Sequence, residues 1–227
     1  MAKVSKEEIT FYNLDGEEIQ KKMKTVDWDA EAAEKAGYEH FMMKEIHEQP
    51  RAVKDTLNSV LKDGKIDLTD IGLAEEDIRR TSQIYIVACG SAYHVGMVAQ
   101  YVIEDLVKIP VRVELASEFR YRKPILDPNG LVIIISQSGE TADSLAALRE
   151  TKAQGIRTLG IVNVVGSSIA READKVFYTL AGPEISVATT KAYSTQLMAS
   201  YILAIQFAKV KNTITEEQYE NYLSLIH

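Results

Sequence analysis

The sequence has a single cysteine, Cys89, among its 227 residues. One cysteine excludes an internal disulfide and is typical of a reducing compartment. No apolar run reaches the roughly 18 residues of a membrane-spanning helix, and the first residues lack the apolar core of a signal peptide. We therefore expect a cytoplasmic protein with no membrane partner.

Positive charge is also scarce. Lysine and arginine number 26 against 33 aspartates and glutamates, a formal net charge of -7. This balance argues against nucleic acid and anionic membrane surfaces as partners. The four histidines have no ligand spacing with cysteine or carboxylates, so we expect no metal site and no cofactor. Any local attraction for an anion must then come from backbone dipoles or a few individual side chains.

From residue 83 onward, short apolar segments alternate with helical ones. The expected strands are 84–88, 111–115, 131–135, 158–162 and 175–179. The expected helices are 93–107, 118–121, 141–154, 168–172, 191–209 and 215–227. Alternation of this kind implies a parallel sheet with right-handed crossovers. We expect a three-layer α/β fold with five strands in the flavodoxin-like order 2-1-3-4-5.

The first part of the chain has a different pattern. Asp15-Gly16 between two short apolar segments predicts a hairpin within residues 1–27, which is too small to be stable alone. A helix is expected from about residue 29 to residue 49, and Pro50 should end it and begin a second helix. A polar segment with Gly64 and Gly72 follows. We divide the chain into 1–27, a helical linker at 28–72, and a main domain at 73–227.

The most informative segment is Ser-Gln-Ser-Gly-Glu-Thr at 136–141, directly after the apolar residues 131–135. A buried strand, a hydroxyl-rich turn and a helix N-terminus together suit an anion, because free N–H groups and the helix dipole point at it. The turn lacks the lysine of a nucleoside-triphosphate loop, so a phosphomonoester is expected. The alternative is that Ser91 and Ser138 only cap helices and that Glu140 only complements the dipole.

Two further loops are expected at the same edge of the sheet. Residues 89–92 follow the first strand, which the order places beside the third strand at the switch point where ligands bind. Residues 184–191 precede the long helix and either contact a ligand or use Thr189 or Thr190 as a cap. Cys89 is expected to be a packing residue rather than a nucleophile. The cationic turn 118–123 is expected to be a solvated surface or a subunit contact.

Four segments carry a family resemblance: Ala-Cys-Gly-Ser at 88–91, Ala-Ser-Glu-Phe-Arg-Tyr-Arg at 116–122, Ser-Gln-Ser-Gly-Glu-Thr at 136–141 and Val-Ala-Thr-Thr-Lys-Ala at 187–192. Together they resemble the first sugar isomerase (SIS) subdomain of the glutamine–fructose-6-phosphate aminotransferase (isomerizing) family, the glucosamine-6-phosphate synthases. Lys-Glu-Ile-His-Glu-Gln-Pro at 44–50 resembles the segment before that subdomain. The hairpin at Asp15-Gly16 resembles the tail of the family's glutaminase domain.

The resemblance implies a binding site for fructose 6-phosphate, glucosamine 6-phosphate or glucose 6-phosphate. It implies that Ser136, Gln137, Ser138 and Thr141 hold the phosphate. Ser91 would contribute at the position where the family usually has threonine. Two further residues, Val187 and Thr189, would line the sugar. Ala92 departs from the family, which usually has a serine there, and this puts one ligand hydrogen bond in doubt.

The family makes glucosamine 6-phosphate from fructose 6-phosphate and glutamine for amino-sugar synthesis. Its glutaminase uses an N-terminal cysteine, whereas this sequence begins Met1-Ala2-Lys3. Its catalytic lysine, glutamate and histidine belong to a second SIS half, and we expect the sequence to stop at His227 before that half. We therefore expect no catalytic residues here, but a sugar-phosphate-binding half that is inactive alone.

Two other functions remain open. One is a free-standing SIS module that senses a phosphosugar, although the acidic N-terminal region has no basic recognition helix. The other is a complete small isomerase, which would need Glu140 or His94 as its base, and neither fits well. A homodimer is expected in each case, because the helix at 191–209 is apolar over more than one face. The alternative is that this helix lies inside the domain.

Overall fold

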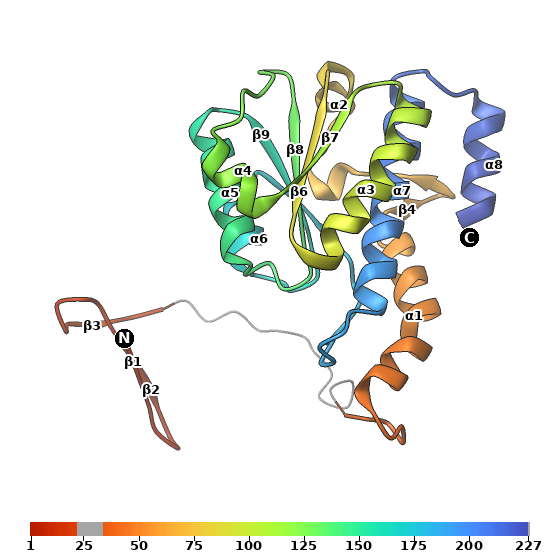
Figure 1. Cartoon of the computed structure of the whole chain (residues 1–227). Coiled ribbons are helices and arrows are strands. Elements are labelled where there is room, and N and C mark those ends of the chain that lie inside the picture. Colours follow the sequence, from red (N-terminus) through yellow and green to blue (C-terminus); the bar gives the residue numbers. More distant parts are fainter. Residues whose placement is uncertain (22–33, 227) are drawn as a thin grey trace.

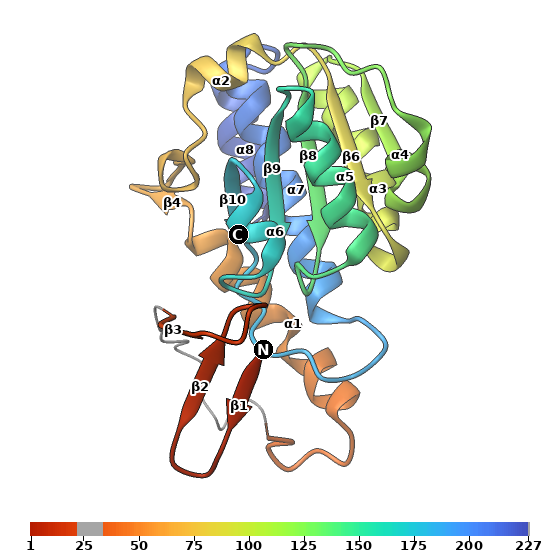
Figure 2. The same cartoon turned by 90° about the vertical axis from the view of Figure 1, so that its left-hand side faces the viewer.

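The computed structural model describes residues 1–21 and 34–226. Five parallel strands form its central sheet: β6 (Ile84–Ala88), β7 (Val111–Leu115), β8 (Leu131–Ser136), β9 (Arg157–Val162) and β10 (Lys175–Tyr178). Their order is β10-β9-β8-β6-β7, as Figure 2 shows. Read from β6 as strand one, this is the expected order 2-1-3-4-5.

Helices cover both faces of this sheet. On one face lie α4 (Ala116–Arg122), α5 (Ala142–Ala153) and α6 (Ser168–Glu172), and on the other lie α3 (Gly90–Val107) and α7 (Lys191–Val210). Two more helices, α1 (Phe41–Asn58) and α8 (Glu216–Ile226), pack against α7 (Figure 1). The three-layer α/β architecture expected from the sequence is confirmed. Within the described residues, no helix has the length and apolarity to cross a membrane.

Strand β8 shows why its sequence is continuously apolar. Leu131, Ile133 and Ile135 join the core beneath α3 and α7, whereas Val132 and Ile134 join the core beneath α4 and α5. Each is at most 2% exposed. Successive side chains of a strand point to opposite faces, so a strand covered on both faces needs apolar residues at every position.

Helix α7 is buried on almost every side. Its buried positions include polar Thr195, Gln196 and Ser200 as well as its apolar residues. It packs against α3, α1, α2 and α8 as well as the sheet. The position of α7 inside the domain therefore explains why apolar residues occur on more than one of its faces. Of the two explanations given above, a subunit contact or burial within the domain, the second is the one observed.

The expected helix break at Pro50 is wrong. Helix α1 runs through Pro50 from Phe41 to Asn58. A proline within a helix leaves the carbonyl four residues earlier without its usual N–H donor. Here that carbonyl, of Ile46, accepts a hydrogen bond from the Gln49 side chain at 3.1 Å. Packing of α1 against α7 stabilises the helix on both sides of the proline.

The start of this helix also differs from the expectation. Residues 34–40 form turns and bends rather than a helix, and the expected positions 29–33 lie outside the described residues. The polar segment after α1 contains a hairpin of β4 (Leu61–Lys62) and β5 (Lys65–Ile66). Asp63 and Gly64 join its strands with positive φ angles of 51° and 73°, as a tight hairpin turn requires.

Two short helices follow this hairpin: η2 (Thr69–Ile71) and α2 (Glu75–Arg80). The sequence reading missed both. The signal for α2 was available, because acidic residues open it and Arg79 and Arg80 close it, which complements the helix dipole.

The N-terminal residues form a separate three-stranded antiparallel sheet. The expected hairpin is present as β2 (Ile9–Tyr12) and β3 (Glu18–Ile19), and β1 (Ala2–Val4) adds an edge strand that was not expected. The Asn13 side chain holds the turn by accepting hydrogen bonds from the N–H groups of Asp15 and Glu17. In both views this sheet lies outside the layers of the main domain (Figures 1 and 2).

Candidate functional site

A cavity of about 350 Å³ opens at the carboxyl end of the sheet. Three loops meet there: the one after β6, the one after β8, and the one between β10 and α7. The cavity is lined by every residue that the sequence assigned to the ligand: Ser91, Ser136, Gln137, Ser138, Thr141, Val187 and Thr189. The structure therefore brings together side chains that are nearly 100 residues apart in the chain.

The turn after β8 is held by its own hydroxyl groups. The Ser136 hydroxyl accepts a hydrogen bond from the Gly139 N–H at 3.1 Å and lies 3.0 Å from the Thr141 hydroxyl. Ser138 Oγ accepts the Glu140 N–H at 3.2 Å. These hydrogen bonds hold residues 136–141 in a tight turn directly before the first turn of α5.

Gly139 makes the tight course of this turn possible. Its φ angle is +64°, in the left-handed region that glycine tolerates best. A Cβ atom at this position would lie only 2.0 Å from Ser167 Oγ. Position 139 therefore excludes a side chain on both conformational and steric grounds.

Neither Ser91 nor Ser138 caps a helix. The N-cap positions of α3 and α5 are Cys89 and Thr141, and neither makes a side-chain capping hydrogen bond. The explanation of these hydroxyls as simple caps is therefore wrong. The N–H groups in the first turn of each helix have no intrahelical acceptor, so both helices direct positive dipole ends and donors toward this edge.

The loop at 184–190 is organised by a residue that the sequence reading missed. Glu184 Oε1 accepts the N–H groups of Thr190 at 2.9 Å and Ala192 at 3.1 Å, and Glu184 Oε2 accepts the Thr189 hydroxyl at 3.0 Å. Thr190 is at the N-cap position of α7 but makes no side-chain capping hydrogen bond. The carboxylate of Glu184 performs the capping role that was expected of Thr189 or Thr190.

The cavity has few ionisable groups. Among the described residues that line it are Glu184 and Cys89 but no lysine or arginine, so any attraction for an anion comes from hydroxyl and N–H groups. Glu184 and Ser186 also line the cavity, from the loop at 184–191 that was expected at this edge, whereas Gln196 of α7 lies outside the expected loops. Residues 1–21 and 34–226 contain no cluster of histidine, cysteine and carboxylate side chains that would hold a metal ion.

Charged residues beside the cavity have structural partners. Glu140 Oε1 accepts the Ser168 N–H at 2.7 Å at the start of α6. Hydrogen bonds from the Ser168 hydroxyl and N–H hold the pKa of Glu140 below its usual value. The cationic turn at 118–123 belongs partly to the core, because Phe119 is fully buried there and Arg120 pairs with Asp143 at 2.7 Å.

Comparisons with known proteins identify relatives of this arrangement. A model of the SIS domain matches residues 77–206. The glutamine–fructose-6-phosphate aminotransferase (isomerizing) of Clostridium acetobutylicum is 56% identical over 218 residues, which cover 96% of this chain and 36% of that protein. The enzyme of the same name from Caldanaerobacter subterraneus is 53% identical over 99% of this chain and 37% of its own length. The chain thus spans little more than a third of the curated relatives it matches.

A solved structure gives the same result. The C-terminal domain of glucosamine-fructose-6-phosphate aminotransferase from Francisella tularensis superposes with a TM-score of 0.82 and 47% sequence identity. The match covers 85% of this chain and 55% of that one.

Proposed function

Because the chain belongs to the SIS-domain family, we propose that the cavity at the carboxyl end of its sheet binds the phosphate group of a sugar phosphate. The observation that carries the proposal is the hydrogen-bonded turn of Ser136, Gly139 and Thr141, which lies directly before the first turn of α5. Hydroxyl donors and a helix N-terminus suit a compact dianion, and none of them needs a charged side chain.

The proposed ligand is fructose 6-phosphate, and glucosamine 6-phosphate and glucose 6-phosphate are related ligands for the same site. The relatives' name supports this choice, since they are named for an amino transfer to fructose 6-phosphate. In this proposal the chain is the phosphosugar-binding half of an isomerase domain. The whole enzyme would use glutamine and fructose 6-phosphate to make glucosamine 6-phosphate and glutamate for amino-sugar synthesis.

Each lining residue then has a part in holding the ligand. Ser136, Gln137, Ser138 and Thr141 would surround the phosphate, and Ser91 would approach it from the start of α3. The sugar would extend toward the loop at 184–190. There it would meet Thr189 and cover Val187, whose side chain is fully exposed.

Binding without turnover is the expected behaviour of this chain alone. Isomerisation of a sugar phosphate needs a base beside the carbonyl carbon. Glu184 is the one carboxylate among the described lining residues, and the loop engages both of its oxygens. A carboxylate that already accepts hydrogen bonds from Thr189, Thr190 and Ala192 is poorly placed to abstract a proton from a substrate. In this proposal, the cavity would hold a sugar phosphate without transforming it.

Calorimetric titration of fructose 6-phosphate into the purified chain tests the proposal, with free fructose as the control. Binding that requires the phosphate is the expected result. Absence of binding to both compounds would contradict a self-sufficient site in this chain. Glucosamine 6-phosphate production by the chain, supplied with glutamine or ammonia, would contradict the absence of turnover.

We also propose that the chain forms a homodimer, on the strength of its family resemblance. Sedimentation equilibrium tests this proposal directly. A single species of 25.3 kDa at all concentrations would contradict it.

A further inference from the structure

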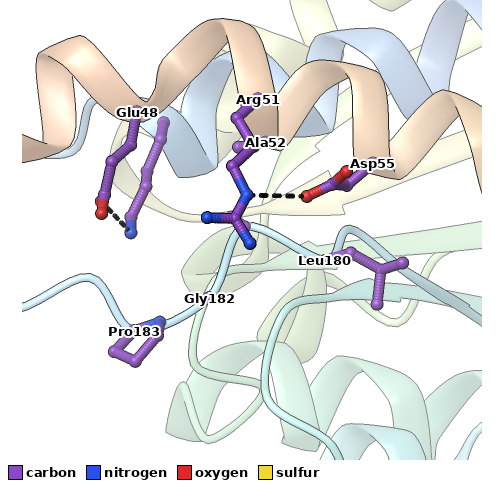
Figure 3. A pocket seen from close by; sticks show the side chains of 9 residues that line it. Glu48, Arg51, Ala52, Asp55, Leu180, Gly182 and Pro183 are labelled. Carbon is purple, nitrogen blue, oxygen red and sulfur yellow. Dashed lines mark hydrogen bonds and ion pairs between the residues drawn. The ribbon is translucent and has the colours of Figure 1, made fainter. Parts of the chain in front are cut away.

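Residues 44–50 of α1 carry part of the family resemblance noted in the sequence, yet they lie outside the region matched by the SIS model. They are also absent from the lining of the phosphosugar cavity. In the structure this part of α1 runs alongside the chain between β10 and α7. Figure 3 shows the contact, with Glu48 on the helix and Gly182 and Pro183 on the opposite segment. The motif thus lies against the loop that borders the cavity.

Glu45 makes the most direct contact with this loop. Its Oε1 atom accepts the N–H groups of Ile185 at 2.6 Å and Ser186 at 3.2 Å. Its Oε2 atom accepts the Ser186 hydroxyl. The glutamate is only 2% exposed, so its carboxylate depends on these donors in place of water.

The neighbouring residues of α1 extend the same contact to the start of α7. Glu48 pairs with Lys191 at 2.7 Å, and the Lys191 side chain is 3% exposed. The Gln49 amide oxygen accepts the Ser194 hydroxyl at 2.6 Å. The loop is therefore connected to α1 at its first residues and where it joins α7.

The loop has little apolar packing of its own. Ile185 is 45% exposed and Val187 fully exposed. A segment with few buried apolar contacts depends on hydrogen bonds for its position. Glu184 supplies these to the second half of the loop and Glu45 supplies them to the first half.

We infer that Glu45 is a positioning residue for the phosphosugar site. It holds Ile185 and Ser186 in place, and so sets where Val187 and Thr189 meet the sugar. This inference rests on the proposed function of the cavity. It assigns the motif at 44–50 to the sugar end of the site rather than to the phosphate end, which residues 136–141 form independently.

The test uses the full chain and the variants Glu45→Ala and Glu45→Gln. Asp55→Ala is the matched control, because Asp55 is an exposed carboxylate on the same helix that pairs with Arg51 at the surface. Hydrogen exchange at the amides of 185 and 186 reports on the loop. Calorimetry with fructose 6-phosphate and with inorganic phosphate separates the sugar end from the phosphate end.

In Glu45→Ala, we expect faster exchange at 185 and 186 and unchanged exchange at 136–141. The Kd for fructose 6-phosphate should rise about tenfold, as expected for loss of hydrogen bonds to a charged group, while the Kd for inorganic phosphate stays the same. Glu45→Gln retains one acceptor oxygen and should lie between the variant and the unmodified chain. Asp55→Ala should match the unmodified chain in every measurement.

Two results would overturn the inference: unchanged exchange in the loop, or an equal weakening of both ligands together with loss of protection at 136–141. The latter would make Glu45 a general support of the fold. If the unmodified chain binds neither ligand, the proposed function fails, and the positioning role fails with it even where exchange at 185 and 186 responds to Glu45. Failure of the proposed function is recognised from titrations of the unmodified chain alone. Failure of the positioning role is recognised from the Glu45 variants.

Discussion

The Ser136 hydroxyl oxygen lies 3.0 Å from the Thr141 hydroxyl oxygen, which joins the last residue of β8 to the residue preceding α5. Ser136 also accepts the Gly139 N–H, whereas Thr141 has no capping hydrogen bond to α5. The two hydroxyls therefore differ in what they do for the turn. Ser136 stabilises the turn through the Gly139 N–H, whereas the Thr141 hydroxyl is bonded only to Ser136.

This difference predicts unequal effects of two alanine variants. Ser136→Ala leaves the buried Gly139 N–H without its acceptor and should lower the free energy of unfolding by about 1–2 kcal/mol. Thr141→Ala should change stability by less than about 0.5 kcal/mol. Both should weaken fructose 6-phosphate binding. Chemical denaturation and calorimetry measure the two effects, and equal stability losses would contradict the assignment.

Substitution at Gly139 should be severe. Gly139→Ala combines the strain of a positive φ angle with a Cβ atom 2.0 Å from Ser167 Oγ. We expect the free energy of unfolding to fall by about 3 kcal/mol, with loss of phosphosugar binding. Thermal denaturation together with ligand titration measures both.

Gly155→Ala is the matched control for this variant. Gly155 has a φ angle of +72°, but nothing lies within 4 Å of its would-be Cβ. It should lose only about 1 kcal/mol, the cost of the backbone conformation alone. Adding Ser167→Gly to Gly139→Ala removes the clash and should recover part of the stability. No recovery would show that the conformation, rather than the contact, is decisive.

The carboxyl group of Glu140 should titrate below the usual glutamate value of 4.5, because Ser168 donates hydrogen bonds to it. Its contribution to stability is then present above pH 4.5 and is lost as the pH falls through the lowered pKa. Carbon-13 NMR of the carboxyl group measures this pKa. Ser168→Ala should move it back toward 4.5, and an unchanged value would exclude the Ser168 hydroxyl as its cause.

Ala92 lines the cavity, and the family resemblance led us to expect a ligand-contacting serine at this position. Ala92→Ser should restore one hydrogen bond to the ligand and lower the Kd for fructose 6-phosphate by about fivefold. Calorimetric titration of the variant with fructose 6-phosphate, and with free fructose as the control ligand, checks that the gain in affinity depends on the phosphate. A weaker binding constant would show that the added hydroxyl does not reach the ligand.

The sheet and the loops that line the cavity are predictable from the sequence because their signals are local. Residues 131–135 are apolar at every position, which only a strand covered on both faces requires, and β8 occupies them. The hydroxyl-rich turn follows at once in the chain. Once the strand order is known, topology alone brings Ser91 and Thr141 to the same edge.

The missed features depend on contacts between distant segments. Glu45 and its partner Ser186 are 141 residues apart, and although both segments stand out locally, nothing in either one indicates that they meet. Pro50 was misjudged for a related reason. Its effect on α1 is decided by the Gln49 side chain and by packing against α7 rather than by the intrinsic preference of proline.

The position of α7 has a consequence for the order of events during synthesis. The helix packs against both α1 and α3, and it leaves the ribosome after every strand of the central sheet. Until residue 210 has emerged, the part of the sheet that α7 covers is exposed, and α1 lacks the helix that it packs against most extensively. This face of the core is therefore completed only after all five strands have been made, so an apolar surface is exposed during synthesis until α7 arrives.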